Sequence, residues 1–480
     1  MKSDLQHPLI VVKNLIVRRD QQLILSDIGF QLCSNDHLAI LGHAGSGKTT
    51  LGRALAKKIY FEGEVSFFPD PKPKIVFVEQ QHGLRNKVNT TDLYYQQRFN
   101  ALDAEDSITV KEFLGDSAST NEIVLDLGLS YLLNKPLIQL SNGENKKIQL
   151  TKYLSAEPDI LILDNPFLGL DADTRAFLHH YLGQLSKRGM ICILITSPDE
   201  IPVFITKILE LNSGRHTFFD LKENFPQKRT AKTHFGSLNS SYFPKKGLGN
   251  DTGFEIAVEM KNVSIQYGEI KILEDINWTV KKGERWHLKG HNGAGKTTLL
   301  SLITGDNPQA YANEIHLFDR KRGTGETIWE IKSKIGFLSP ELHLFYDKST
   351  SLFNTIGSGF FDSIGLFQRL NENQKQLIQE WLFYLGFEKF KDKYLYELSP
   401  GQQRLALLAR AFIKNPPLLI LDEPCQGLDQ LQKREVLNLI DFACMDINKT
   451  LIYVSHYDEE KPRSLSKTIT LKGGVIEMVE

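Results

Sequence analysis

Two copies of one short pattern constrain this chain more than any other feature of its sequence. Residues 42–49 and residues 290–297 both fit G-x-x-x-x-G-K-S/T, and the two copies start 248 residues apart. In this pattern the glycines let backbone N–H groups turn toward a polyphosphate, and the lysine reaches its β- and γ-phosphates. The apolar residues after each copy predict a helix whose N-terminal partial positive charge faces the same anion. The sequence therefore predicts two nucleotide-binding loops.

The candidate nucleotide-binding residues are the members of both loops and the threonine that follows each loop. Within them, the hydroxyls of Thr49 and Thr297 are placed to bind Mg²⁺. The candidates are Gly42, His43, Ala44, Gly45, Ser46, Gly47, Lys48, Thr49 and Thr50 in the first copy, and Gly290, His291, Asn292, Gly293, Ala294, Gly295, Lys296, Thr297 and Thr298 in the second.

Two further runs indicate that each loop belongs to a parallel sheet. Ile160–Asp164 and Leu418–Asp422 are continuously apolar and end in an acid. Such runs are typical of buried parallel strands that carry a carboxylate to the ligand-binding edge of the sheet. Asp164 and Asp422 are therefore candidate metal ligands.

The repeat also predicts the domain organisation of the 480 residues. Apolar strands open both copies at the same offset, and a strand leads into each loop. We expect an α/β fold with one domain at residues 1–220, a Pro- and Gly-broken linker at 221–254, and a second domain at 255–480.

A third repeated motif predicts a second anion-binding helix start in each copy. The stretches Leu140–Glu144 and Leu398–Gln402 share a serine and a glycine ahead of a helical pattern. The glycine precedes the strand aspartate by 21 residues in both copies. Ser141, Gly143, Ser399 and Gly401 are therefore candidate nucleotide-binding residues.

The composition argues against several kinds of protein. Lys and Arg number 57 and Asp and Glu number 58, so net charge gives no reason to expect nucleic acid or acidic lipid as a partner. No apolar run approaches the roughly 18 residues that span a bilayer, and the N-terminus has no apolar signal core. The four cysteines lack C-x-x-C spacing and indicate reduced, buried thiols of a cytosolic protein.

The order of these motifs resembles the nucleotide-binding domain of ATP-binding cassette (ABC) ATPases. Phosphate loop, L-S-x-G-Q/E motif and a strand ending in Asp-Glu-Pro follow one another in both halves, with Asp-Asn-Pro in the first. The resemblance implies two P-loop NTPase domains in tandem, with mostly parallel sheets, helical subdomains and antiparallel edge subdomains, and with ATP and Mg²⁺ as cofactors. Blocks at 304–309, 323–329 and 359–365 resemble the ModF type, tandem cassettes associated with molybdate uptake operons.

In this family two cassettes pair head to tail, and each ATP lies between one phosphate loop and the other domain's L-S-x-G motif. The resemblance therefore implies intramolecular pairing of the two halves. Site one would combine Lys48, Thr49 and Asp164 with Ser399 and Gly401, and site two would combine Lys296, Thr297 and Asp422 with Ser141 and Gly143.

The two sites differ in the groups that hydrolysis needs. Glu423 follows Asp422 and can act on the attacking water, whereas its counterpart Asn165 is a neutral amide that cannot accept a proton. His456 matches the family's histidine that contacts the γ-phosphate, and its counterpart is Ser197. We expect site two to hydrolyse ATP and site one to hold it. The alternative is that both changes have no mechanistic meaning.

Three further residues carry expectations. Tyr267, at the place of Arg19 in the first copy, could stack on adenine; it could equally be a surface tyrosine in a turn. Gln80 matches the family's Mg²⁺-binding glutamine. In the second copy that place is Pro340, which cannot ligate Mg²⁺ through its side chain, and the sequence leaves open whether Ser339 or Glu341 substitutes.

Three functions fit these observations. The first is an ATPase that energises a separate membrane permease, with molybdate or a related oxyanion as cargo and a cytoplasmic location at the inner membrane. The second is a soluble ATPase acting on the ribosome or nucleic acid, which the short, mildly basic linker disfavours. The third is a slow ATP-dependent switch, which the altered first site and Pro340 favour.

Overall fold

The computed structural model of the chain forms two compact units, one before residue 227 and one after residue 252. It describes residues 8–19, 22–43, 45–68, 73–79, 108–115, 122–137, 140, 142–167, 170, 172–226, 244, 253–267, 270–428, 430–445, 447–455 and 460–480. Both units are α/β, as the motif order predicts.

A six-stranded, mostly parallel sheet forms the centre of the first unit. Its strand order is β5-β6-β7-β3-β8-β9, in which only β9 runs antiparallel to its neighbour. The strands are β3 (Leu38–Gly42), β5 (Ile75–Val78), β6 (Ile160–Asp164), β7 (Ile191–Ile195), β8 (Lys207–Asn212) and β9 (Arg215–Leu221). Every residue of β6 and β7 is buried, because helices cover both faces of such a sheet.

The other elements of the first unit are a small antiparallel sheet and several helices. The antiparallel sheet has the order β2-β1-β4. Its strands are β1 (Pro8–Arg19), β2 (Gln22–Cys33) and β4 (Glu62–Phe67); the helices are α1 (Lys48–Leu55), α3 (Val110–Leu114), α4 (Glu122–Asp126), α5 (Asn142–Leu154) and α6 (Ala172–Lys187), with 3₁₀ turns η3 (Ser130–Leu132), η5 (Pro198–Glu200) and η6 (Lys222–Asn224).

The second unit repeats the central sheet of the first, and among the described residues its antiparallel sheet has one more strand. Its central sheet has the order β15-β16-β17-β12-β18-β19, again with only the last strand antiparallel to its neighbour. These strands are β12 (Arg285–Lys289), β15 (Ile335–Leu338), β16 (Leu418–Asp422), β17 (Thr450–Val454), β18 (Lys467–Lys472) and β19 (Val475–Val479). The antiparallel sheet contains β10 (Ile256–Tyr267), β11 (Ile270–Lys281), β13 (Glu314–Leu317) and β14 (Arg320–Lys321).

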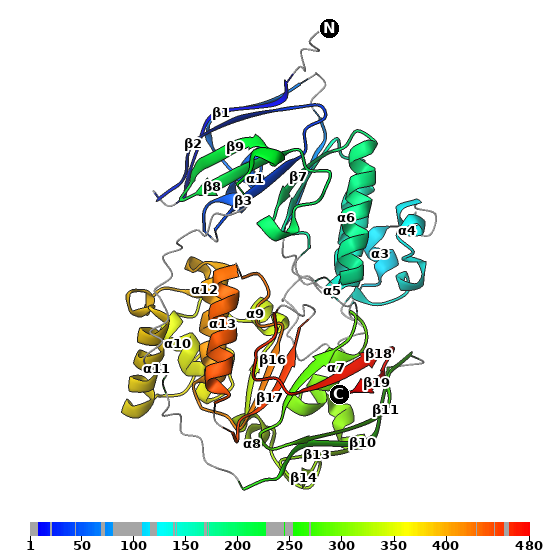
Figure 1. The fold of residues 1–480 in the computed structure, drawn as a ribbon, viewed down its shortest axis with the longest axis vertical. Coiled ribbons are helices and arrows are strands. Elements are labelled where there is room, and N and C mark those ends of the chain that lie inside the picture. Colours follow the sequence, from blue (N-terminus) through cyan, green and yellow to red (C-terminus); the bar gives the residue numbers. More distant parts are fainter. Residues whose placement is uncertain are drawn as a thin grey trace. The chain divides into compact units, whose positions relative to one another are not determined.

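The helices of the second unit divide into two groups. In Figure 1, α10, α11, α12 and α13 lie on the side away from β10, β11, β13 and β14, so the unit has a helical part and an antiparallel part. The helices are α7 (Lys296–Thr304), α8 (Ile328–Ser333), α9 (Pro340–Phe345), α10 (Leu352–Gly357), α11 (Glu372–Leu385), α12 (Pro400–Phe412) and α13 (Gln430–Ala443), with 3₁₀ turns η7 (Pro308–Ala312), η8 (Ser358–Phe360), η9 (Glu388–Phe390) and η10 (Leu395–Glu397).

At the two ends of residues 221–254, the range expected to form a linker, the structure describes the end of a strand and a buried side chain. Leu221 is the last residue of β9. Phe254 is buried, and its ring meets that of Phe318 edge-on at 5.1 Å. The four cysteines are free thiols and all are buried, as the sequence predicts.

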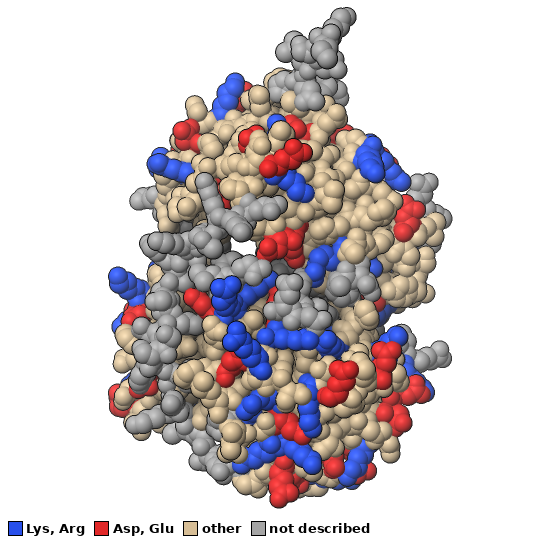
Figure 2. All heavy atoms as spheres, viewed as in Figure 1, with Lys and Arg blue, Asp and Glu red and all other residues tan. Residues whose placement is uncertain are grey.

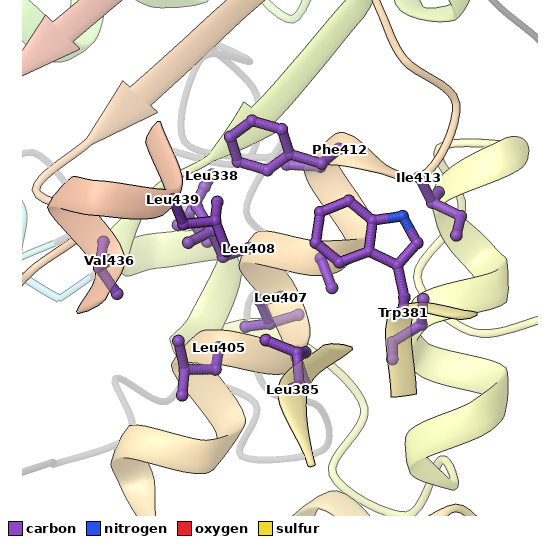
Figure 3. Packing of buried hydrophobic residues seen from close by; sticks show 14 of the residues in the cluster. Leu338, Trp381, Leu385, Leu405, Leu407, Leu408, Phe412, Ile413, Val436 and Leu439 are labelled. Atoms are coloured by element: carbon purple, nitrogen blue, oxygen red, sulfur yellow. The ribbon is translucent and has the colours of Figure 1, made fainter. Parts of the chain in front are cut away.

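Trp381 lies at the centre of the largest hydrophobic cluster of the second unit. Figure 3 shows its indole beside Phe412 of α12, with Leu338 of β15 and Leu439 of α13 packed in the same cluster. The indole is 2% exposed and lies 6.0 Å from the Phe412 ring, centroid to centroid. This cluster joins the helical part to the sheet that carries Asp422.

We expect Trp381→Ala to lower the free energy of unfolding of the second unit by about 3–5 kcal/mol, because it removes a buried aromatic ring and leaves a cavity. The control is Trp329→Ala, which removes an indole that is 60% exposed and should change stability by about 0.5 kcal/mol or less. All four tryptophans lie in the second unit, so tryptophan fluorescence in urea follows this unit alone. Equal losses in the two variants would contradict the core assignment.

Candidate nucleotide sites

The glycines of the two phosphate loops have similar backbone φ angles. Each loop leaves a central strand, β3 or β12, and enters a helix, α1 or α7, through a glycine with φ 99°, Gly47 or Gly295. A Cβ at Gly42 would lie 2.2 Å from the Leu211 carbonyl oxygen. Only glycine fits this approach, so the start of the loop is packed closely against the backbone of β8.

The loop lysines are held by their own loops. Lys48 donates from Nζ to the carbonyl oxygens of Gly42 and His43 at 2.6 and 2.7 Å. Lys296 donates to those of Gly290 and His291 at 2.6 and 3.0 Å. Each ammonium therefore lies over its loop, where a polyphosphate would sit.

The first unit brings a hydroxyl and a carboxylate together at the loop. Thr49 Oγ1 donates to Asp164 Oδ2 at 2.6 Å, and Asn165 Nδ2 donates to Asp164 Oδ1 at 2.8 Å. Burial raises the pKa of Asp164, and the Thr49 hydrogen bond and the Lys48 charge oppose this rise. A hydroxyl oxygen and a carboxylate oxygen are hard donors that suit Mg²⁺.

The second unit places more acid around its aspartate. Asp422 ends β16 and is 8% exposed. Burial raises the pKa of Asp422 well above its usual range, and repulsion from Glu341 and Glu423 adds to the rise. The Lys296 and Arg404 charges act in the opposite direction. Together with Thr297, which occupies the same place on α7 as Thr49 on α1, this set also fits Mg²⁺.

Asn165 and Glu423 occupy the same backbone position in the two units. Both have φ 46°, in the left-handed region. The Asn165 N–H donates to the Ile195 carbonyl at 2.8 Å, and the Glu423 N–H donates to the Val454 carbonyl at 2.9 Å. The two sites therefore present an amide and a carboxylate from matching positions.

The L-S-x-G motif of the second unit starts helix α12. Ser399 Oγ accepts from the Gln402 N–H at 3.3 Å, and Gln402 Oε1 accepts from the Ser399 N–H at 3.0 Å. A Cβ at Gly401 would lie 2.6 Å from Gln432 Nε2, so a side chain there would require the Gln432 side chain to move. In the first unit, Gly143 lies in the first turn of α5.

Tyr267 is anchored at both ends of its side chain. Its hydroxyl accepts from Asn307 Nδ2 at 3.0 Å, and its ring packs partly buried against the core of the second unit. Its counterpart Arg19 ends β1, as Tyr267 ends β10. Adenine stacking by Tyr267 stays a prediction.

The segment that replaces the family's glutamine forms a helix start. Ser339 Oγ accepts from the Leu342 N–H at 3.0 Å, so its side chain caps α9, and Pro340 is the first residue of that helix. Glu341 is 9% exposed and close enough to Asp422 to raise its pKa. Of the two substitutes left open by the sequence, Ser339 caps α9, and Glu341 is the one whose charge acts on Asp422.

Four candidate residues lie outside the described part of the chain. They are Ala44, Gln80, Ser141 and His456. Ser197, the counterpart of His456, is the second residue after β7 and immediately precedes η5.

Sequence reasoning missed the buried Arg404 next to this site and the partly buried His343 that lies near it. Arg404, on α12 and 1% exposed, lies beside Asp422 and Glu341, and His343, on α9, lies near Arg404. A signal for Arg404 was present, because it lies four and eight residues before Leu408 and Phe412 on the apolar stripe of its helix. A charged residue on such a stripe needs polar partners.

Comparison with known proteins decides the family. A family model described as "ABC transporter" matches residues 25–168 and again residues 273–426. The chain belongs to the ABC transporter family of ATP-binding proteins. It is thus an ABC-type ATPase with two cassettes, and members of this family bind ATP with Mg²⁺.

Several relatives match this ABC protein along most of its length. It is 36% identical to the ABC transporter ATP-binding protein ModF of Escherichia coli, over 91% of each chain. It is 31% identical to an uncharacterised ABC transporter ATP-binding protein of Schizosaccharomyces pombe, over 94% of this chain and 95% of that one. A similar protein of Saccharomyces cerevisiae is 28% identical over 72% of this chain and 70% of its own.

In the part of the ABC protein that the structure describes, no helix combines the length and the apolar character needed to cross a membrane.

His343 gives this site a pH-dependent stability. Its Nε2 lies 2.9 Å from Gln403 Oε1, and burial, with the Arg404 charge, lowers the pKa of His343 to about 4. The unfolded chain therefore binds this proton at higher pH than the folded chain does. Stability from this group is present above pH 6.5 and is lost as the pH falls toward 4.

We expect His343→Gln to flatten this pH dependence, because glutamine cannot take up the proton. Between pH 6.5 and 4 the wild-type second unit should lose up to about 3 kcal/mol more unfolding free energy than the variant. Tryptophan-detected urea unfolding at several pH values measures the difference. Parallel curves for the two proteins would contradict the assignment.

Proposed function

We propose that this ATPase hydrolyses ATP at the second-unit site and retains ATP at the first-unit site. The observation that supports this is the shared backbone position of Glu423 and Asn165. A carboxylate at that position can accept a proton from the attacking water. The Asn165 amide cannot accept one, and it is already bonded to Asp164. Lys296, Thr297 and Asp422 would position the triphosphate and Mg²⁺ at the working site.

We also propose that the two cassettes pair head to tail within one chain. Each unit carries a phosphate loop and an L-S-x-G motif, which are the two halves of a family site. Ser399 and Gly401 would then close over the ATP of the first unit, and Ser141 and Gly143 over that of the second. Tyr267 is the proposed adenine contact of the second site.

The process that this ATPase drives is proposed to be transport through a separate membrane permease. Support comes from the Escherichia coli relative, which carries the name ModF and the description of a transporter ATP-binding protein. We propose uptake of molybdate or a related oxyanion at the cytoplasmic face of the inner membrane. On the face drawn in Figure 2, acidic and basic residues are interspersed, which gives no support to a nucleic-acid partner on that face.

A slow nucleotide-dependent switch is the second candidate. It is favoured by the helix start at Ser339–Pro340, which takes the place of the glutamine that the family uses to couple ATP to a membrane subunit. A turnover rate far below 1 s⁻¹, against the 1–10³ s⁻¹ typical of enzymes, would favour the switch.

Glu423→Gln should lower ATP turnover by about 10²-fold or more, because it removes the group that accepts the proton of the attacking water. Asn165→Ala is the matched control at the same backbone position and should change turnover by about twofold or less. Phosphate release by the purified full-length chain measures both. Equal losses in the two variants would contradict the asymmetry.

A permease partner should be recoverable from membranes. The tagged Glu423→Gln chain, loaded with Mg²⁺-ATP, is expected to co-purify with an integral membrane protein from detergent-solubilised membranes, since blocked hydrolysis prolongs the ATP-bound state. The Lys48→Ala/Lys296→Ala chain, impaired in phosphate binding at both loops, controls for non-specific capture. Co-sedimentation with ribosomes and no membrane protein would reject the permease proposal.

A further inference from the structure

Arg404 binds the backbone at the end of the strand that carries the proposed catalytic carboxylate. Nη2 donates to the carbonyl oxygens of Asp422, at 3.1 Å, and Glu423. Nε donates to that of Pro424 at 3.3 Å, and Nη1 to that of Ser339 at 3.1 Å. One guanidinium on α12 therefore joins the residues that follow β15 and β16.

The backbone bound by Arg404 has an unusual conformation at Glu423. Glu423 has φ 46°, a conformation that residues with a Cβ adopt rarely, Asn and Asp being the usual exceptions. Its N–H is bonded to Val454 of β17, and its carbonyl is bonded to Arg404. With both of its peptide groups fixed, the direction of the Cα–Cβ bond from which the carboxylate extends is fixed as well.

Arginine is the residue suited to this task. Its planar fork can donate to several carbonyls at once and it keeps its charge when buried, whereas lysine is a compact point charge. Burial lowers the pKa of Arg404, and the nearby Glu423 and Asp422 charges oppose this lowering. The cation thus balances part of the acidic charge that the second site gathers.

The first unit has a different residue at the matching place. Lys146 follows Gly143 by three residues, as Arg404 follows Gly401. Burial lowers the pKa of Lys146 to about 8, and the Asp164 charge opposes this. The branched guanidinium of an arginine therefore occurs in the unit with Glu423, and the unit with Asn165 has a lysine in its place. Asparagine tolerates the left-handed conformation more readily than glutamate does.

We infer that Arg404 is a positioning residue for ATP hydrolysis, which holds the backbone of Glu423 so that its carboxylate is aimed at the attacking water. This rests on the proposed role of Glu423. By this inference, helix α12 has two roles. It carries Ser399 and Gly401 at its N-terminus, and through Arg404 it holds the backbone of the proposed catalytic residue of its own unit.

The test compares Arg404→Lys with Arg410→Lys in the full-length chain. Arg410 is a second buried arginine on α12, 4% exposed, and it donates to Ser358 Oγ at 3.0 Å and to the Ser363 carbonyl at 3.2 Å, in the helical part. Both variants keep the positive charge and replace a buried guanidinium by an ammonium group. Only Arg404→Lys removes a hydrogen bond to the Glu423 carbonyl. The readouts are kcat, the dissociation constant of a fluorescent ATP analogue, and the pH profile of kcat.

Arg404→Lys should lower kcat by about 10- to 100-fold, the cost of a small misplacement of a reacting group. The dissociation constant of the variant for the ATP analogue should stay within about threefold of the wild-type value, and the pH profile of its kcat should not shift. Arg404→Gln, which loses the cation as well as the hydrogen-bonding geometry, should lower kcat at least as much. Arg410→Lys should leave kcat within about twofold of wild type.

Three outcomes would overturn the inference. They are an unchanged kcat in Arg404→Lys, an equal loss in Arg410→Lys, and failure of both Arg404 variants to fold while Arg410→Lys folds, which would make the role purely structural. Wild-type turnover that Glu423→Gln does not reduce would instead reject the proposed function itself, so the two failures can be told apart.

Discussion

The structure depends on one backbone constraint, which occurs once in each unit. The chain leaves a fully buried strand through an aspartate and then turns at once through a residue with φ 46°. The N–H of that residue is bonded to the adjacent parallel strand, so the sheet itself fixes the turn. The side chain at this position can therefore change while its place relative to the phosphate loop stays the same. In this chain the change is from Asn165 to Glu423.

The charges around Asp164 and Asp422 also differ between the two sites. Asp164 is bonded to a hydroxyl and an amide and lies near Lys48 and Lys146. Asp422 is crowded by Glu341 and Glu423, and burial together with this repulsion raises its pKa well above the usual range. Gathering acids in a buried place is unfavourable for the fold alone and suits a site meant to receive a cation. Arg404 partly offsets this charge in the second unit.

The fold and much of the candidate sites could be predicted because their signals are local. The spacing of glycines predicted the two phosphate loops, and continuous apolar runs that end in an aspartate predicted strands β6 and β16. The capping role of Ser339 was also readable, since a serine before a proline is a helix-start signature, although its side chain was left open as a Mg²⁺ ligand. The contacts of Arg404 were not, because its partners are backbone carbonyls of residues 18 to 65 positions away, and no residue type records such a contact.

The central claim is that one bound ATP is kept and the other is turned over, and nucleotide retention tests it most directly. The full-length chain is incubated with Mg²⁺ and radiolabelled ATP and freed of unbound nucleotide, and the retained ATP and ADP are counted. The account predicts slowly exchanging, intact ATP that Lys48→Ala abolishes and Lys296→Ala leaves in place. Conversion of all retained ATP to ADP at one rate, or its loss only in Lys296→Ala, would contradict it.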